Sequence, residues 1–174
     1  RNKANQEKLW QGIKNGDIQV VATDHCPFSY EKEKVPMGKD DFTKCPNGAP
    51  GVEARIPVLF SEGVMKGRIS INKFVEVTST NPAKICGMYP KKGSIAVGSD
   101  ADLVIFDKDK KVTITKSLFH ENVDYTSYEG IELQGYPIMT IVRGKVIVKD
   151  NEFIGEEGYG QFIKRYKNDE YVRY

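Results

Sequence analysis

The segment Ile18-Gln19-Val20-Val21-Ala22 is followed directly by Thr23-Asp24-His25-Cys26-Pro27, and this junction decides how the chain is interpreted. The first five residues form a short apolar run that predicts a buried strand. In parallel α/β barrels, catalytic groups lie where the strands end and the loops to the next helices begin. An aspartate there can ligate a cation and exchange protons with water, or it can simply cap the following turn. The spacing alone leaves both interpretations of Asp24 open.

Composition and charge limit the classes of protein to which the chain can belong. Its 174 residues are enough for one sizeable hydrophobic core or two small ones. The 26 basic and 24 acidic residues nearly cancel, so the net charge gives no indication of nucleic acid or another polyanionic partner. No apolar run approaches the roughly 18 residues of a membrane span, and no signal peptide is visible. We therefore expect neither a nucleic-acid partner nor a membrane partner.

The three cysteines, Cys26, Cys45 and Cys86, are odd in number and widely spaced. Because no Cys-x-x-Cys pair is present, we expect free thiols in a cytoplasmic protein rather than a disulfide framework. His25, Cys26 and Cys45 could gather around a structural zinc ion, but they lack the paired spacing that is typical of such sites. Buried or half-buried thiols are the favoured interpretation.

Helix signals dominate the first half of the chain. Leu9, Trp10 and Ile13 share one helical face and predict a helix over 5–15. Residues 26–50 look like a loop, and a loop of that length in a compact domain is usually functional or disordered.

Three further helices are expected after this loop. Apolar spacing predicts one over 52–66, in which we expect Pro57 to cause a kink. Ser70 is the expected cap of the next helix, and Pro82 stands in the favoured first position of a short one that ends at Gly87.

Beyond Gly87 the pattern changes from helices to strands. Residues 103–106, 112–114 and 138–149 are rich in β-branched side chains and predict strands, with a hairpin turn over 143–145. We therefore expect an α/β part over 1–88 and a β-rich part over 89–157, followed by a polar and aromatic tail over 158–174.

The α/β part has too few strands to be complete. A parallel sheet needs several strands that are covered on both faces, and a single strand with three helices cannot form one. Because the chain also begins with Arg1 rather than Met, we expect it to be a fragment of a longer protein.

Several segments along the chain carry recognisable motifs: Val21–Phe28, Asp40–Gly48, Gly51–Glu53, Thr80–Lys84, Lys92–Val104, Val123–Tyr125 and Tyr128–Gly130. In this order, and over nearly the whole chain, they resemble the C-terminal portion of the dihydropyrimidinases, also called D-hydantoinases. The Gly-x-x-Ala-Asp-Leu segment alone would indicate only the wider cyclic-amidohydrolase superfamily, whereas Asp-His-Cys-Pro-Phe and Phe-Thr-Lys-x-Pro-Asn-Gly are much narrower.

The resemblance implies an α/β fold, namely the C-terminal part of a metal-dependent (β/α)₈ TIM-barrel amidohydrolase and part of a small β-sandwich domain. Residues 1–88 would supply the last strand and outer helices of the barrel, and 89–157 the sandwich-like domain. The full-length protein would be a cytoplasmic homotetramer, and the tail over 158–174 would dock on a neighbouring subunit.

The implied activity is hydrolysis of the ring amide of dihydropyrimidines or 5-substituted hydantoins. Family members hold two zinc ions with histidines, a carboxylated lysine and one aspartate. That aspartate matches Asp24, which would be both a metal ligand and the catalytic base, whereas the other ligands lie outside this chain. His25 would support the site through hydrogen bonds, and His120 would be a surface or packing histidine. Asn47 would bind the imide edge of the substrate, although Pro-Asn-Gly also favours a turn by itself.

Three alternatives accompany this interpretation. Dihydroorotases and allantoinases share several elements, but Phe42-Thr43-Lys44 and Asn47 favour the dihydropyrimidinase branch. The collapsin response mediator proteins are dihydropyrimidinase-like binding proteins without the metal-binding aspartate, and the presence of Asp24 argues against that class. Finally, we expect the isolated 174-residue chain to be inactive, because most metal ligands lie outside it.

Overall fold

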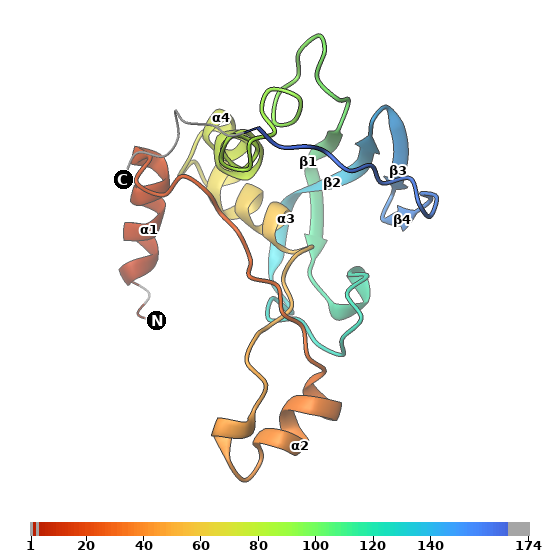
Figure 1. Ribbon diagram of the computed structural model, residues 1–174. Helices are drawn as coiled ribbons and strands as arrows, with labels where there is room; N and C mark the ends of the chain where they lie inside the picture. The colour runs from red at the N-terminus through yellow and green to blue at the C-terminus, as the bar shows by residue number, and fades with distance from the viewer. Residues whose placement is uncertain (1, 3, 167–174) are drawn as a thin grey trace.

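The computed structural model describes residue 2 and residues 4–166, in which a layer of helices packs against an antiparallel sheet (Figure 1). The sheet has the order β1-β2-β3-β4, so each strand pairs with its neighbour in the sequence. The strands are β1 (Leu103–Thr113), β2 (Glu132–Val142), β3 (Lys145–Lys149) and β4 (Glu152–Phe153).

Most helices precede the sheet, and several follow one another without a break, so that α-helical and wider π-helical turns form continuous runs. The α-helices are α1 (Ala4–Asn15), α2 (Val35–Gly38), α3 (Arg55–Leu59), α4 (Ile71–Val75) and α5 (Asn81–Ile85). The π-helical segments are η1 (Tyr30–Lys34), η3 (Phe60–Met65) and η4 (Glu76–Thr80), and the 3₁₀ turns are η2 (Phe42–Lys44) and η5 (Lys116–Leu118).

Local capping signals explain where these helices begin. The Ser70 hydroxyl accepts a hydrogen bond from the Lys73 N–H at 3.1 Å, which confirms the predicted start of the helix there. Pro82 stands in the first turn of α5, where a missing N–H costs nothing. Pro57 is also in a first turn, because α3 begins at Arg55 rather than at residue 52, so this proline is tolerated for the same reason.

An aromatic cluster joins the helices to the sheet. The Phe60 ring of η3 lies 5.5 Å from the Phe74 ring of α4 in an edge-to-face arrangement and 4.6 Å from the Phe106 ring of β1. Such contacts add to the stabilisation from burial alone. A second buried cluster lies where α3 meets the lower part of the sheet and contains Ala54, Ile114, Phe119, Leu133 and Tyr136.

The predicted strand over 18–22 is not a strand in the structure. Its backbone groups bond to helices instead: the Val21 N–H donates to the Val77 carbonyl, and the Gln19 carbonyl accepts a hydrogen bond from the Asn81 side chain. The physical reason is that a strand exists only through a pairing neighbour, and no neighbour is present among the described residues.

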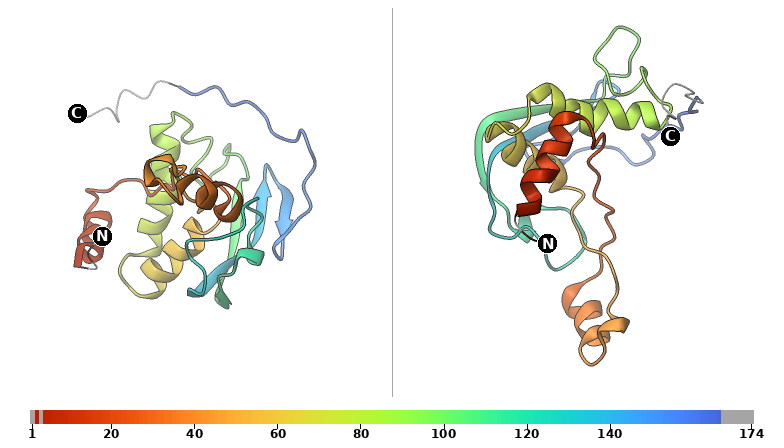
Figure 2. Two further views of the ribbon diagram at one scale, coloured as in Figure 1. Left: turned by 90° about the horizontal axis from the view of Figure 1, so that it is seen from below. Right: turned by 90° about the vertical axis from the view of Figure 1, so that its left-hand side faces the viewer.

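The predicted loop over 26–50 is also more ordered than expected. Residues 28–46, here called the arm, contain η1, α2 and η2 and project away from the helices and the sheet (Figure 2). The side chains of Ser29 and Asp41 cap η1 and η2 by accepting hydrogen bonds from the N–H groups of Lys32 and Thr43. These capping residues are local signals for helical turns within a polar segment.

The strands predicted beyond Gly87 are present, but their bounds differ from the prediction. Arg143 and Gly144 have φ angles of 45° and 80°, as the predicted hairpin turn requires. Strand β2 begins at Glu132 rather than at residue 138. Part of the predicted tail returns over the helices, where the Tyr166 N–H donates to the Gly87 carbonyl at 2.9 Å; the last eight residues of that tail, 167–174, lie outside the described residues.

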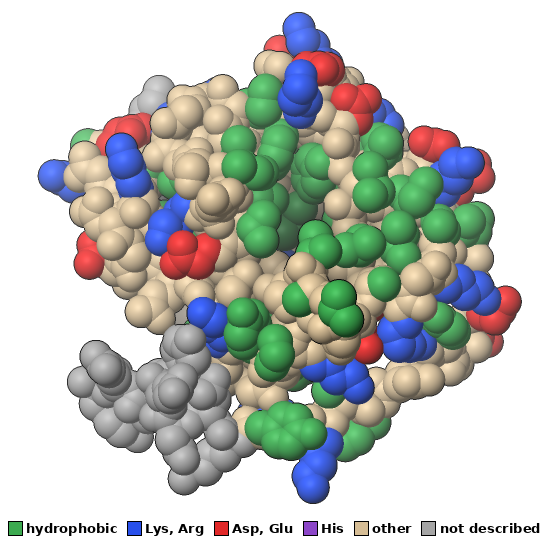
Figure 3. All heavy atoms as spheres, turned by 90° about the horizontal axis from the view of Figure 1, so that it is seen from above, with side chains coloured by type: hydrophobic (Ala, Val, Ile, Leu, Met, Phe, Trp, Pro, Cys, Tyr) green, Lys and Arg blue, Asp and Glu red, His purple; other side chains and the backbone are tan. Residues whose placement is uncertain are grey.

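Hydrophobic side chains gather around a hollow on the face seen in Figure 3. A hollow of about 720 Å³ lies between α4, η4 and the start of β1, and it is bordered by the exposed apolar side chains of Ile71, Val75, Ile95 and Val104. Among residue 2 and residues 4–166, no helix has the length and apolar character needed to cross a membrane.

Gly135 supplies a test of how tightly the helices and the sheet pack. Its φ angle is +87°, and an added Cβ would overlap the Phe60 ring. Gly130 is a matched control, because its φ angle is +79° and nothing lies within 4 Å of an added Cβ. Gly130→Ala should therefore cost about 1–2 kcal/mol for backbone strain alone. Gly135→Ala should cost about 1–3 kcal/mol more, since it also overpacks the core.

Urea unfolding of the two variants beside the unchanged chain measures both costs. Equal losses of unfolding free energy would contradict the close packing of Phe60 on β2.

Candidate functional site

Asp24 stands at a sharp turn between the segment 18–22 and the arm. Its φ angle is +50°, a left-handed conformation that an aspartate tolerates better than most residues. The side chain is exposed, and its carboxylate accepts no hydrogen bond and forms no ion pair within the described part of the chain. Both carboxylate oxygens are therefore available to a ligand or a proton.

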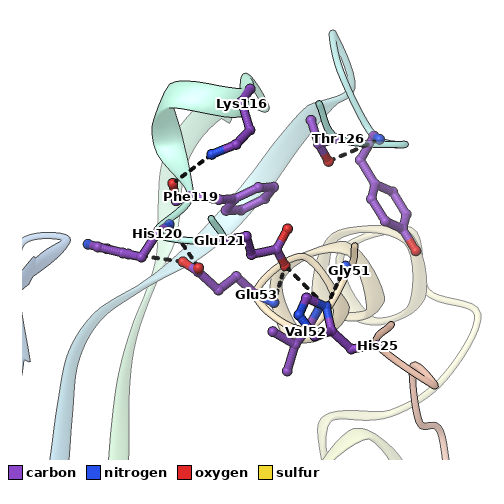
Figure 4. Close-up of polar contacts among 10 residues, drawn as sticks. His25, Gly51, Val52, Glu53, Lys116, Phe119, His120, Glu121 and Thr126 are labelled. Carbon is purple, nitrogen blue, oxygen red and sulfur yellow. Dashed lines mark hydrogen bonds and ion pairs between the residues drawn. The ribbon is translucent and has the colours of Figure 1, made fainter. Parts of the chain in front are cut away.

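His25 faces the turn over residues 51–54 that leads into α3, here called the helix start, and its ring caps this turn (Figure 4). Its Nδ1 atom accepts hydrogen bonds from the N–H groups of Gly51 at 3.1 Å and Val52 at 3.3 Å. N–H groups at a helix start lack partners within the helix, so a side chain must supply the acceptor. Because Nδ1 is the acceptor, the neutral ring carries its proton on Nε2. The imidazole thus holds the residue next to Asp24 against the helix.

Two glutamates complete the surroundings of this helix start (Figure 4). Glu121 has a buried side chain, its Oε1 accepts the Glu53 N–H at 3.2 Å, and the same oxygen lies 3.8 Å from His25 Nδ1. Glu53 points the other way and accepts the His120 N–H at 2.8 Å, with the His120 Nδ1 3.0 Å from its second oxygen. The His120 side chain is about half exposed and pairs with Glu53.

Asn47 directly follows the arm. It lies close to the turn of Asp24 because the two segments that flank the arm run side by side. The Cys26 N–H donates to the Ala49 carbonyl at 3.3 Å, and the Cys26 backbone leaves no room for a side chain on Gly48. The Lys34 ammonium donates to the Pro46 carbonyl at 2.6 Å and closes the arm just before Asn47. Asn47 itself is exposed, so its amide is accessible to a ligand.

Asp124 fastens the arm to the rest of the molecule. Its carboxylate accepts hydrogen bonds from the N–H groups of Tyr30 at 2.6 Å and Glu31 at 2.9 Å and from the Ser29 hydroxyl at 2.8 Å. The backbone N–H groups of Glu31 and Tyr30, with the Ser29 hydroxyl, lower the pKa of Asp124 to about 2. The neighbouring Tyr125 ring also contacts the Tyr30 ring, with centroids 5.8 Å apart.

The segment that precedes Asp24 is held by the helices. The guanidinium of Arg55 in α3 donates to the Val21 carbonyl at 2.8 Å, and its burial lowers its pKa below the ordinary arginine value. Asn81 of α5 donates to the Gln19 carbonyl at 2.9 Å. With the Val77 carbonyl of η4, which accepts the Val21 N–H, three helical elements fix the path of the chain into the turn.

The predicted site residues Asp24, His25 and Asn47 fall at one end of the molecule, at the base of the arm. Their roles stay predictions. Three partners were missed at the sequence level: Arg55, Glu121 and Asp124. Asp124 belongs to a segment that carries the family resemblance, whereas no local pattern marks Arg55 or Glu121, because their partners are far away in the sequence.

The donor chemistry fits a metal ion only in part. Within residue 2 and residues 4–166, no three His, Cys, Asp or Glu side chains are grouped closely enough to hold one. Cys26, Cys45 and Cys86 are free thiols. Asp24 offers two unengaged carboxylate oxygens, which suit one ligand position of a zinc ion. This chain can therefore supply one ligand of a shared site.

Known proteins share sequence similarity with this chain over nearly its whole length. The profile described as "Amidohydrolase family" matches residues 1–147. The D-hydantoinase of Geobacillus stearothermophilus is 48% identical over 167 residues, which are 96% of this chain and 35% of that protein. The chain thus spans about a third of the length of the curated relatives it matches.

Solved structures agree with the sequence relatives. D-hydantoinase from a Bacillus sp. AR9 is 52% identical with a TM-score of 0.91, over 95% of this chain and 36% of that one. Dihydropyrimidinase from Brevibacillus agri NCHU1002 is 50% identical with a TM-score of 0.91, over the same shares of the two chains. These similarities confirm the resemblance and the fold class inferred from the motifs.

The attachment of the arm should depend on pH through Asp124. A folded-state pKa of about 2 is below the ordinary aspartate value, so the ionised form favours the attached arm at higher pH. That contribution is complete above the unfolded pKa of about 3.9 and is lost as the pH falls toward the folded value. Hydrogen exchange should show protection factors at the Tyr30 and Glu31 amides that fall between pH 5 and pH 2. In Asp124→Asn they should be low and nearly constant; an unchanged pH dependence would contradict this role.

Proposed function

The chain belongs to the amidohydrolase family, and from this we propose that it forms the C-terminal part of a cyclic amidohydrolase acting on dihydropyrimidines or 5-substituted hydantoins. The names of its relatives, D-hydantoinase and dihydropyrimidinase, support this choice of substrate class. In this proposal residues 1–88 contribute the outer helices of the barrel and the segment 18–22, which would become its last strand by pairing with strands outside this chain. Residues 89–157 contribute to the small β domain, and the tail over 158–174 docks on a neighbouring subunit.

The carboxylate of Asp24 is the observation that carries the proposal. It is exposed and unengaged at a turn that is held on one side by the Arg55 contact to Val21 and on the other by His25. A side chain in that condition can take up and release a proton without disturbing its own support. Cleavage of a ring amide needs such a group twice, because the attacking water must lose a proton and the leaving nitrogen must gain one.

Asp24 would carry out both proton transfers. One oxygen accepts the proton of the attacking water as the amide carbon becomes tetrahedral. The same carboxyl group then donates that proton to the ring nitrogen, so that the carbon–nitrogen bond breaks and the ring opens. His25, with Nδ1 engaged by the helix start, keeps the turn in place during both transfers.

Asp24 would also contribute one ligand to a pair of zinc ions. The remaining ligands, histidines and a carboxylated lysine in the resembling family, would come from polypeptide outside this chain. Two bound zinc ions would lower the pKa of the attacking water and polarise the amide carbonyl.

Asn47 would orient the substrate. Asn47 is exposed and directly precedes Gly48, which packs against the Cys26 backbone two residues after Asp24, and this supports the assignment. An amide can donate to one carbonyl of an imide and accept from its N–H, and the adjacent backbone can add a further hydrogen bond.

The wider setting follows from the same family assignment. Three free thiols are suited to the reducing cytoplasm, where we place the protein. We also infer a homotetramer that takes part in the breakdown of pyrimidines, since dihydrouracil is one of the proposed substrates.

The activity should belong to the complete polypeptide that carries this sequence. Supplied with zinc, it should hydrolyse dihydrouracil and hydantoin but not dihydroorotate or allantoin, and the isolated 174-residue chain should hydrolyse none of them. Asp24→Asn should lower kcat by at least about 10³-fold, because both proton transfers lose their carrier. Asp17→Asn is the matched control, since Asp17 is exposed and lies seven residues before Asp24.

A complete polypeptide that prefers dihydroorotate or allantoin would move the protein to another branch. A complete polypeptide inactive on all four rings would indicate a binding protein. Near-normal turnover by Asp24→Asn would contradict the role of this carboxylate.

Asn47→Ala should weaken substrate binding and leave the chemistry almost unchanged. Loss of one or two hydrogen bonds corresponds to a rise in KM of about 3–30-fold, with kcat within about 3-fold of the parent value. Asn72→Ala on the exposed face of α4 serves as the control in the same steady-state assay. An unchanged KM for Asn47→Ala would argue against contact with the substrate.

A further inference from the structure

The connection between β1 and β2 contains a short segment, residues 119–126, that reaches both parts of the candidate site. We call it the brace. Glu121 extends from it to the start of α3, beside His25, and Asp124 extends to the start of the arm. Both side chains are acidic, and both accept backbone N–H groups from segments that are distant in the sequence.

Glu121 is unusual because it is buried with little compensation. Its side chain is 2% exposed, and its Oε2 atom has no hydrogen-bond partner among the described residues. Burying a carboxylate in this way is costly. Its Oε1 is the acceptor for the Glu53 N–H, next to the two N–H groups that His25 accepts. Glu121 and His25 together therefore satisfy three successive N–H groups at the start of α3.

Because of this arrangement, the position of Asp24 depends on the position of Glu121. His25 and Glu121 both accept hydrogen bonds from the helix start, and His25 is the next residue after Asp24. If the helix start shifted, the imidazole and the turn would shift with it. Since the groups that orient a metal ligand commonly tune metal affinity, and a shift of the turn would reorient Asp24, we expect the effect to appear in zinc affinity.

Asp124 acts on the other part of the site. Its three hydrogen bonds hold Ser29, Tyr30 and Glu31, which open the arm, and the Lys34 contact to Pro46 links the arm to the residue before Asn47. Release of the carboxylate would free the arm at its base. The turn of Asp24 would keep its own contacts through His25.

We propose that the brace positions the two parts of the site independently: Glu121 positions the turn that carries Asp24, and Asp124 positions the arm that leads to Asn47. The proposal rests on the proposed function for its kinetic consequences. Glu121 and Asp124 are positioning residues, because each acts through another segment of the chain.

The test compares variants of the two acids in the complete, zinc-loaded polypeptide. Glu121→Ala should lower zinc affinity, measured by chelator competition, by about 10–100-fold and should lower kcat with little change in KM. Asp124→Ala should raise KM by at least about 3-fold and leave zinc affinity and kcat unchanged. Glu121→Gln and Asp124→Asn retain an acceptor oxygen, so each should recover part of the loss.

Glu132→Ala and Asp109→Ala are the controls, since both residues are exposed and lie on the sheet. Variants of Glu121 and Asp124 that changed kcat, KM and zinc affinity together would overturn the independence of the two positions. If the variants lowered only the melting temperature and left kcat, KM and zinc affinity unchanged, the brace would stabilise the fold without positioning the site, and the proposal would be wrong.

Hydrogen exchange separates failure of this proposal from failure of the proposed function. Without any hydrolase activity, Glu121→Gln should still raise exchange at residues 51–53 and leave the arm protected. Asp124→Asn should raise exchange at residues 29–31 and leave 51–53 protected. Exchange that rises in both segments of either variant would contradict the proposal.

Discussion

The start of α3 is the constraint on which the site depends. N–H groups at the beginning of a buried helix have no partners within the helix and must find acceptors elsewhere. Here the acceptors come from His25, which precedes Gly51 by 26 residues, and from Glu121, which follows Glu53 by 68 residues. Neither acceptor can be in place unless the helix, the turn of Asp24 and the brace are assembled together. The geometry around Asp24 is therefore a property of the whole fold and not of its local sequence.

Polar and apolar groups on some surfaces of the described residues lack the partners that they would have in a complete fold. The segment 18–22 bonds to Val77, Asn81 and Arg55 in place of neighbouring strands. An apolar hollow of about 720 Å³ stays open beside α4, and one oxygen of Glu121 has no partner among the described residues. Exposed apolar surface and an unpaired buried carboxylate oxygen are both costly. Further polypeptide packed on these surfaces would remove both costs. The chain matches about a third of the length of its relatives, so such contacts are expected.

How far the sequence predicts the structure depends on the range of the interactions involved. The cap at Ser70 and the hairpin turn at Arg143 follow from nearby residues, and both are predicted correctly. The first part of β2 contains Gly135 and Pro137, which disfavour a strand, yet its pairing with β1 prevails. For segment 18–22 the prediction of a strand is wrong for the opposite reason: its β-branched residues favour a strand, but no neighbouring strand is present among the described residues to pair with it. In the site, motifs indicate Asp24, His25 and Asn47. The residues that hold them are distant in the sequence, so only the structure reveals them.

Asp24 differs from its neighbours in a way that matters for chemistry. Arg55 holds the segment before it and His25 holds the residue after it, yet Asp24 itself combines a left-handed backbone with an unengaged carboxylate. Sites that depart from local preferences persist only when the surrounding structure determines them, and such departures concentrate where function requires them. If the turn were held by the carboxylate of Asp24, each change in its protonation would loosen the support. Because other groups hold the turn, the position of this carboxylate does not depend on its own charge, and the proposed transfer of a proton from water to a ring nitrogen requires that independence.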